Sequence, residues 1–84
     1  MYLEIVTPDK KIFEGEVVAA SFPGTDGFFQ VLNNHAPLVS TLGKGLIVYR
    51  DKKEEFEINV DGGVVEVLHN RVIVLAESIV EEED

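Results

Sequence analysis

Apolar and polar residues alternate along most of this chain, and that two-residue period predicts β-strands. Near the start, Leu3 and Ile5 share one face of a segment whose other face carries Glu4. Residues 54–60 alternate cleanly, with an apolar residue at every second position. This pattern is typical of a half-buried antiparallel strand. No segment shows the sustained apolar period of about 3.6 residues that marks an amphipathic helix, so no helix is predicted.

Prolines, glycines, asparagines and aspartates separate the predicted strands, because their backbone preferences suit chain reversals. Gly15 predicts a bend inside one long strand over residues 11–22. Turns recur about every 8 to 12 residues, which is typical of a sandwich or a barrel. We therefore predict an all-β domain of about eight to ten short strands, mostly antiparallel. The predicted turns are 8–10, 24–27, 51–53, 61–63 and 69–70, and Pro23-Gly24 is predicted to end the strand before the second of these turns.

Residues 24–46 form the longest stretch without a regular pattern, and we predict an irregular working surface there. Phe28 and Phe29 are adjacent, so in a strand their side chains point to opposite faces. One ring is then predicted to enter the core and the other to be an exposed interface anchor, unless a covering loop buries both. Pro37 keeps the residue before it extended, which gives the loop a fixed shape. Residues 43–45 (Gly-Lys-Gly) are predicted to turn the chain between two strands.

Composition and charge narrow the classes of function. The 84-residue length fits one domain, which we place at residues 1–80. The net charge of −9 argues against binding to nucleic acid or to an anionic lipid surface. Residues 81–84 are all acidic and are predicted to be a disordered tail rather than a docking tail. No apolar run approaches the ~20 residues of a membrane span, and the lack of cysteine fits a cytosolic protein.

Catalysis has little support in the sequence. Asp26, His35 and Ser40 could be imagined as a catalytic triad, but Ser40 lacks the glycine elbow that exposes a nucleophile. No histidine stands in a spaced metal motif, and Asp26 has too few oxygen-bearing neighbours for a calcium loop. We therefore predict no catalytic residue, metal or cofactor. Two alternatives stay open, a stand-alone β-sandwich module that binds a small ligand or glycan, and an enzyme that uses these three residues.

Several short motifs, each weak alone, follow one another across nearly the whole chain. The motifs are Leu3-x-Ile5-Val6-Thr7-Pro8, Phe13-x-Gly15, His35-Ala36-Pro37-Leu38, Gly45-Leu46-Ile47, Glu55-Phe56, Gly62-Gly63-Val64-Val65-Glu66-Val67 and Val72-Ile73-Val74-Leu75-Ala76-Glu77. In this order and spacing, over residues 3–77, they closely resemble the epsilon subunit of the F-type ATP synthase, which is called delta in mitochondria.

The resemblance implies a flattened antiparallel β-sandwich that is not catalytic. In that family the domain lies at the foot of the central stalk, packs on the gamma subunit and contacts the polar loops of the c-ring. It couples proton- or sodium-driven rotation to ATP synthesis, as a peripheral part of the synthase on the cytoplasmic face of the bacterial membrane. Matching positions predict a c-ring-facing loop of Gly24, Asp26, Gly27, Phe28, Phe29 and Gln30. They predict gamma-facing positions at Thr7, His35, Ala36, Pro37, Leu38 and Ser40.

The chain departs from the family pattern at several points. Gln30 stands where the ring-facing loop commonly has its second glycine, and Asn33-Asn34 replaces a Pro-Gly pair. Asparagine tolerates positive φ, so the turn is predicted to survive. Phe28 and Phe29 replace more polar residues, which predicts a more apolar contact with the c subunits. The chain ends at Asp84 without a helical hairpin, so neither inhibition of ATP hydrolysis nor ATP binding is predicted, and a natural short form is expected.

Overall fold

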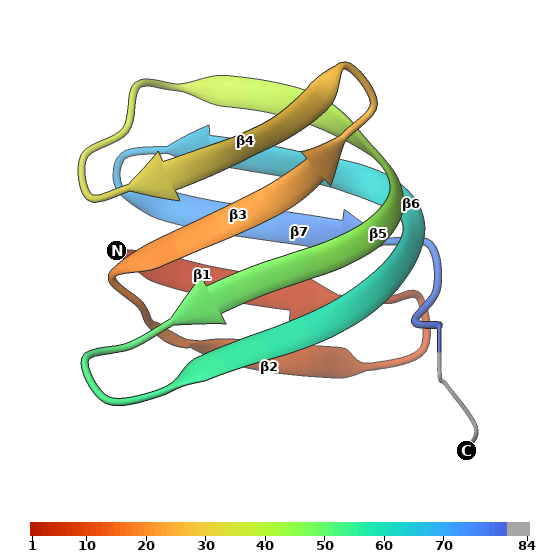
Figure 1. The fold of residues 1–84 in the computed structure, drawn as a ribbon, viewed down its shortest axis with the longest axis horizontal. Coiled ribbons are helices and arrows are strands. Elements are labelled where there is room, and N and C mark those ends of the chain that lie inside the picture. The colour runs from red at the N-terminus through yellow and green to blue at the C-terminus, as the bar shows by residue number, and fades with distance from the viewer. Residues whose placement is uncertain (81–84) are drawn as a thin grey trace.

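The computed structural model describes residues 1–80, so the predicted acidic tail at 81–84 lies outside the described residues. The described chain contains seven strands and no helix, and all seven belong to one sheet in the order β2-β1-β7-β6-β5-β3-β4 (Figure 1). Only β1 and β7 pair in parallel. The strands are β1 (Tyr2–Val6), β2 (Lys11–Glu16), β3 (Ala19–Gly24), β4 (Gly27–Leu32), β5 (Leu38–Arg50), β6 (Glu55–Leu68) and β7 (Arg71–Ala76).

The sheet folds over on itself because its two longest strands, β5 and β6, both bend (Figure 1). One layer consists of β2, β1, β7, the last part of β6 and the first part of β5. The other layer consists of the first part of β6, the last part of β5, β3 and β4. The predicted all-β sandwich, mostly antiparallel, is therefore confirmed. Seven strands are enough to form two layers because β5 and β6 each contribute to both.

The turns predicted at residues 43–45 and 61–63 are wrong, because the chain bends there without reversing. Pairing of β5 with β6 continues through this region, with Leu42 opposite Gly63 and Lys44 opposite Asp61. Gly45, Gly62 and Gly63 all have positive φ, at 159°, 86° and 145°. Two neighbouring strands thus carry their glycines at the same level, where a shared bend needs backbone angles that other residues adopt poorly.

Pro23 lies at the inside of this bend. Proline has no N–H to give to a neighbouring strand, and the β3–β5 pairing is interrupted there. The register jumps from Ser21 opposite Val48 to Gly24 opposite Leu42. A Cβ placed on Gly45 would lie 3.0 Å from the Cβ of Pro23. The bend in β5 therefore lies beside Pro23, a residue that could not have continued the hydrogen bonding between β3 and β5.

The single long strand predicted over residues 11–22 is also wrong. Gly15 stays in register opposite Leu3, and the chain breaks later, at Val17-Val18. The N–H of Val17 donates to the carbonyl of Met1 in one layer, at 2.9 Å. The N–H of Val18 donates to the carbonyl of Arg50 in the other layer, at 2.8 Å. The chain therefore crosses between layers at these two residues, and the buried side chain of Val17 fills the crossing.

Other local predictions are confirmed. The turn at residues 69–70 joins β6 to β7, and both residues have positive φ. At the 51–53 hairpin, Oδ1 of Asp51 accepts hydrogen bonds from the N–H groups of Lys53 and Glu54, at 2.7 and 2.8 Å. These bonds lower the pKa of the Asp51 carboxyl.

The core lies between the two layers and follows the alternation of the sequence. Leu3 and Ile5 are fully buried, as their period predicts. Three rings close one side of the sandwich, because Tyr49 lies between Phe13 and Phe56 with centroid separations of 4.5 and 5.3 Å. Among residues 1–80 no charged or polar side chain is buried. The core is therefore held by apolar packing, and at its margin the buried ammonium group of Met1 pairs with the exposed carboxylate of Glu16 at 3.3 Å.

Replacing Gly63 with alanine is expected to lower the free energy of unfolding by about 2–3 kcal/mol. The added Cβ would lie 2.5 Å from the carbonyl oxygen of Leu75, at a positive φ. Urea unfolding followed by circular dichroism measures the change. Gly43→Ala is the matched control, because its Cβ meets no atom closer than 3.9 Å and should change stability by less than about 1 kcal/mol. Equal midpoints for the two variants would contradict the role given to the bend.

Candidate functional site

One continuous stretch of the chain carries no charged side chain. No aspartate, glutamate, lysine or arginine occurs between Asp26 and Lys44, although the chain has 16 acidic and 7 basic residues. Residues 27–43, which we call the uncharged edge, form β4, the loop at 33–37 and the start of β5, gathered on one side of the molecule (Figure 1). A stretch of this length without charge on a protein of net charge −9 is a candidate surface for protein contacts.

The prediction that residues 24–46 lack regular structure is wrong, because most of this segment is strand. In β4, Phe29 and Val31 face the core, while Phe28, Gln30 and Leu32 face outward. Two of the three outward residues are apolar, so polar and apolar residues do not alternate as they do in the other strands. The side chains of β4 do alternate between the two faces of the sheet, but apolar residues stand on both faces, so the sequence does not show the alternation.

Phe28 and Phe29 point to opposite faces, as predicted. The side chain of Phe28 is 70% exposed. The ring of Phe29 packs on Phe22, with 5.5 Å between centroids. A Cβ on Gly24 would lie 3.0 Å from the Phe29 ring and 2.7 Å from the carbonyl oxygen of Gly27, so glycine is needed there. Phe28 is therefore the exposed anchor, and Phe29 belongs to the packed interior.

Two free strand edges run along the uncharged edge. β4 is the last strand of the sheet and pairs only with β3. Among residues 1–80, the start of β5 pairs with β6 on one side, and the end of β3 meets it at Leu42 on the other side. Exposed apolar side chains stand on both, namely Phe28, Leu32 at 49% exposure and Val39 at 67%.

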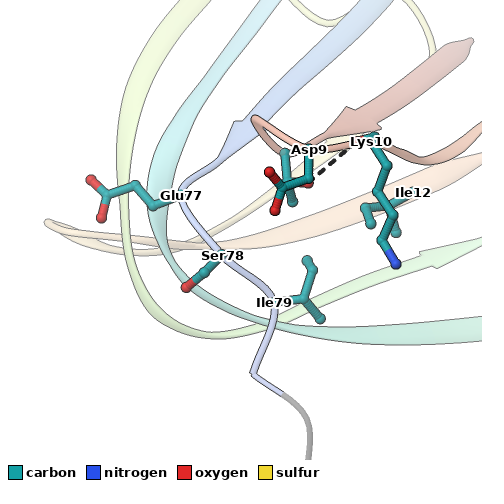
Figure 2. A pocket seen from close by; sticks show the side chains of 7 residues that line it. Asp9, Lys10, Ile12, Glu77, Ser78 and Ile79 are labelled. Atoms are coloured by element: carbon teal, nitrogen blue, oxygen red, sulfur yellow. Dashed lines mark hydrogen bonds between the residues drawn. The ribbon is translucent and has the colours of Figure 1, made fainter.

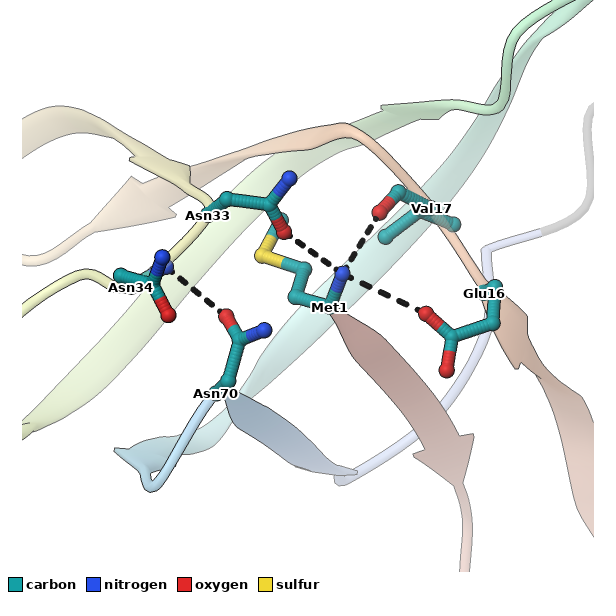
Figure 3. A network of polar contacts seen from close by, with 6 residues as sticks. All are labelled: Met1, Glu16, Val17, Asn33, Asn34 and Asn70. Carbon is teal, nitrogen blue, oxygen red and sulfur yellow. Dashed lines mark hydrogen bonds and ion pairs between the residues drawn. The ribbon is translucent and has the colours of Figure 1, made fainter.

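Polar contacts hold the loop at 33–37 in place (Figure 3). The ammonium group of Met1 donates to Oδ1 of Asn33 at 2.7 Å and to the carbonyl of Val17 at 3.0 Å. The N–H of Asn34 donates to Oδ1 of Asn70 at 2.8 Å. Asn34 has a φ of 63°, so asparagine supports the positive-φ turn as predicted. The loop is thus tied to the start of β1 and to the β6–β7 turn.

His35 occupies this loop as a hydrogen-bonded, half-buried residue. Its Nδ1 lies 2.8 Å from the carbonyl oxygen of Ala36, and its N–H donates to the carbonyl of Leu32 at 3.2 Å. An open hollow of about 370 Å³ lies beside it. The hollow is lined by Asn34, His35, Ala36, Pro37, His69 and Asn70.

The structure separates several residues that the sequence groups. Thr7 directly follows the end of β1, whereas the His35 loop lies at the start of β1, about 17 Å away along the strand. Asp26 and His35 lie at opposite ends of β4, about 20 Å apart. The side chain of Ser40 faces the same side as buried Val65 and donates to the Thr41 carbonyl at 3.2 Å. Asp26, His35 and Ser40 therefore do not converge into a triad.

The other predicted positions lie along the uncharged edge or, for Gly24 and Asp26, directly before it. Gly24 and Gly27 flank the β3–β4 turn, in which Asp26 is exposed, and Gln30 points outward from β4. Ala36 and Pro37 are exposed in the loop. Leu38 starts β5 and packs partly against the core.

A second apolar surface was missed by the sequence reasoning. Val6, Leu75 and Val64 lie directly opposite one another on β1, β7 and β6, and Thr41 continues the line on β5. We call the first three the apolar row. Leu75 is 56% exposed and Val64 38% exposed. Each of the three is an apolar residue at a position where the alternation of its strand predicts a polar one, and this departure could have indicated the surface from the sequence. The register between distant strands was needed to see that they form one row.

Charged residues border the apolar row on the β2 side. The hydroxyl of Tyr2 donates to the carboxylate of Glu14, which raises the pKa of Tyr2 to about 12. The ammonium of Lys11 lies 3.3 Å from a carboxylate oxygen of Glu4 and 3.1 Å from one of Glu14. The guanidinium of Arg71 lies over the Tyr2 ring at 4.5 Å. Charge thus protects the β2 edge, in contrast to the uncharged edge.

A shallow pocket of about 270 Å³ lies between the β1–β2 turn and the segment after β7 (Figure 2). Thr7, Asp9, Lys10, Ile12, Glu77, Ser78 and Ile79 line it. Within residues 1–80 no group of three metal-ligating side chains comes together, here or elsewhere. The part of the chain that the structure describes also has no helix able to cross a membrane.

Comparisons with known proteins agree on one family. Residues 1–82 match the family described as "ATP synthase, Delta/Epsilon chain, beta-sandwich domain". The ATP synthase epsilon chain of Chlorobium limicola is 43% identical over 79 residues, which cover 92% of this chain and 89% of that one. The epsilon chain of Leptospira borgpetersenii is 41% identical over 75 residues, covering 89% of this chain and 59% of that one. This chain thus spans about three fifths of the length of several relatives.

Solved structures show the same fold. A chain in the Euglena gracilis mitochondrial ATP synthase, solved as "OSCP/F1/c-ring in rotational state 1", matches with a TM-score of 0.86 and 22% identity. The match covers 93% of this chain and 51% of that one. A chain in the Tetrahymena thermophila "central stalk/cring" structure matches with a TM-score of 0.80 and 17% identity, covering 95% and 65%. At these identities the likeness shows a shared fold.

Replacing Asn70 with glycine is expected to loosen the loop at 33–37 without unfolding the β6–β7 turn. Glycine keeps the positive φ of residue 70 but removes the oxygen that accepts from the N–H of Asn34. Amide hydrogen exchange of Asn34, read by NMR, should quicken about fivefold. Asn70→Asp retains an acceptor oxygen and should leave the exchange rate within about twofold of the wild type. Unchanged exchange in the glycine variant would show that this contact does not hold the loop.

Proposed function

The chain belongs to the family of ATP synthase delta/epsilon chains, and on this premise we propose that it is a non-catalytic subunit of the rotor. In this role it joins the gamma subunit to the c-ring, so that ion-driven rotation is coupled to ATP synthesis. The observation that carries the proposal is the one-sided surface: a chain of net charge −9 that gathers exposed apolar side chains on an uncharged edge and an adjoining apolar row. Such a surface suits permanent contacts with other proteins.

The apolar row is the proposed docking surface for the gamma subunit. It crosses the outer face of one layer from Val6 to Val64, and Thr7 follows it directly at the end of β1. At the other end of the row, Thr41 and Val39 point outward on β5. Two of the predicted gamma-facing positions, Thr7 and Ser40, therefore flank the row. The outward side chains of Val39 and Thr41, rather than the inward one of Ser40, are the contacts we propose on β5.

The β3–β4 turn is the proposed contact with the c-ring. Asp26 and Gly27 are exposed at its tip, and Phe28 stands beside them with most of its ring uncovered. The turn is anchored to the first layer, because the N–H of Thr25 donates to the carbonyl of Thr41 at 3.0 Å. The hydroxyls of the same two threonines lie 2.6 Å apart. The proposed ring contact and the proposed gamma contact therefore meet at one hydrogen-bonded junction.

A rigid connection between the two proposed contacts is what a subunit that transmits torque requires. The two surfaces are linked by strand pairing and by the continuous strands β5 and β6, without a flexible linker between them. In the proposed assembly the subunit is peripheral, at the cytoplasmic face of a bacterial membrane, and the coupling ion is a proton or sodium ion handled by other subunits.

Replacing Leu75 with aspartate is expected to weaken binding to purified gamma subunit at least tenfold. The change places a charge in the middle of the apolar row, at a side chain exposed enough for the fold to tolerate it. Isothermal titration calorimetry with gamma measures the effect. Leu68→Asp is the matched control, since Leu68 is 43% exposed on the same face but lies beyond the row, opposite Arg71. Equal loss in both variants, or no loss in either, would contradict docking at the row.

Replacing Phe28 with serine is expected to weaken attachment to a c-ring–gamma assembly while changing the free energy of unfolding by less than about 0.5 kcal/mol. Phe29→Ser should instead destabilise the fold by about 2–3 kcal/mol, because its ring packs on Phe22. Co-purification with detergent-solubilised c-ring and gamma reads the first effect, and urea unfolding reads the second. A Phe28→Ser variant that co-purifies as fully as the wild type would rule out this residue as a ring contact.

A further inference from the structure

The two edge strands of the sheet, β2 and β4, differ in how well they are protected against pairing with a strand of another molecule. β2 carries Lys11, Glu14 and Glu16, and such charges discourage pairing with another strand. β4, with the sequence GFFQVL, carries no charge and no proline. Within residues 1–80, β4 pairs with no strand other than β3. One side of β4 therefore presents unpaired backbone groups to solvent, without the features that usually guard such an edge.

The backbone groups that face the free side of β4 can be identified from the register. Gly24 and Gly27 flank a two-residue turn and pair directly, so they exchange hydrogen bonds, and alternate pairs along the hairpin do the same. By this alternation Phe28, Gln30 and Leu32 direct their N–H and C=O groups away from β3. Pro23 agrees with this assignment, because it lies opposite Phe28, where no N–H is required toward β4.

We propose that two copies of this chain pair antiparallel through the free edges of β4, around a two-fold axis at Gln30. Phe28 of one copy then lies opposite Leu32 of the other, and the two Gln30 residues lie opposite each other. The pattern of apolar, amide, apolar is the same read from either end, so it suits an isologous contact. The carbonyl of Leu32 already accepts from the N–H of His35 within each copy, so the three pairs supply about four new backbone hydrogen bonds. The Phe28–Leu32 pairs also cover exposed apolar surface.

The start of β5 is a poorer partner for the same purpose. The carbonyl of Thr41 is already bonded to the N–H of Thr25. Pro37, just before the strand, has no N–H to offer. On β4 only the carbonyl of Leu32, at the end of the strand, is already bonded, to the N–H of His35. Among residues 1–80, Phe28 and Gln30 keep both outward backbone groups free, which is why the second copy is assigned to β4.

The pairing is weak and depends on salt. An interface made by one strand edge is smaller than the ~1,200 Å² of stable complexes, so we expect a dissociation constant on the order of 0.1–1 mM. Each copy has a net charge of −9, and the resulting repulsion is screened by added salt. Pairing covers Phe28, so a paired copy cannot use Phe28 at a c-ring contact; this consequence alone depends on the proposed function.

Sedimentation equilibrium of the isolated chain from 10 μM to about 1 mM tests the pairing, together with NMR hydrogen exchange at both ends of that range. We expect a concentration-dependent dimer that is strengthened by salt. Exchange of the Phe28, Gln30 and Leu32 amides should slow severalfold at high concentration, while the amides of Gly27, Phe29 and Val31 keep their rates. A monomer at all concentrations would overturn the proposal, as would concentration-dependent protection at residues 38–41 instead of β4.

Gln30→Glu should abolish the dimer, because it places two carboxylates opposite each other at the two-fold axis. Ser21→Glu is the matched control: Ser21 pairs with Gln30 on β3 and adds the same charge one strand farther from the contact. Its dimer should persist at 0.15 M salt, where charges beyond about 8 Å are screened. Loss of the dimer in both variants would indicate repulsion by net charge and would contradict a contact centred on Gln30. No gamma subunit takes part, so the outcome is independent of the rotor function.

Discussion

The shared bend of β5 and β6 is the constraint on which the rest of this structure depends. A single sheet becomes two layers only if neighbouring strands turn the same corner at the same level. Gly45, Gly62 and Gly63 supply the backbone angles, and the approach of Gly63 to the Leu75 carbonyl leaves no room for a side chain. Pro23 fits the corner from β3 because it has no N–H to leave unpaired. The corner then brings the β3–β4 turn against Thr41, and with it the two surfaces proposed for partners.

Local patterns were enough to predict the fold class and several turns, but not the corner. Alternation identified the buried faces of β1 and β6, and it separated Phe28 from Phe29. Glycines at 43–45 and 61–63 suit a reversal and a bend equally well. The choice depends on whether the flanking segments pair with each other or with a common neighbour, as Leu42 and Lys44 do with β6. That information lies outside any local window.

In the candidate site, too, the sequence predicted features that depend on neighbouring residues and missed those that depend on pairing between distant strands. The sequence drew attention to Phe28 because two phenylalanines are adjacent, and to the loop at His35 because the run from Asn33 to Pro37 breaks the strand pattern. It missed the apolar row because Val6, Val64 and Leu75 are distant along the chain and meet only through the β1–β7 and β6–β7 registers. The hydropathy pattern also concealed β4, since two of its three outward residues are apolar. Surfaces that bind proteins break the polar-outside rule, so the rule fails where function is concentrated.

The distribution of charge follows from these two surfaces. Water is removed more cheaply from uncharged surface than from charged surface, so the parts of this chain of net charge −9 that lack acids are favoured for extensive apolar contacts with other proteins. The uncharged edge and the apolar row provide that area, and they adjoin at Thr25 and Thr41. Two partners bound there would be held by one body in which each contact is connected to the other through paired strands. Such a body resists twisting through its hydrogen-bonded sheet, whereas a linker between two domains would absorb the rotation.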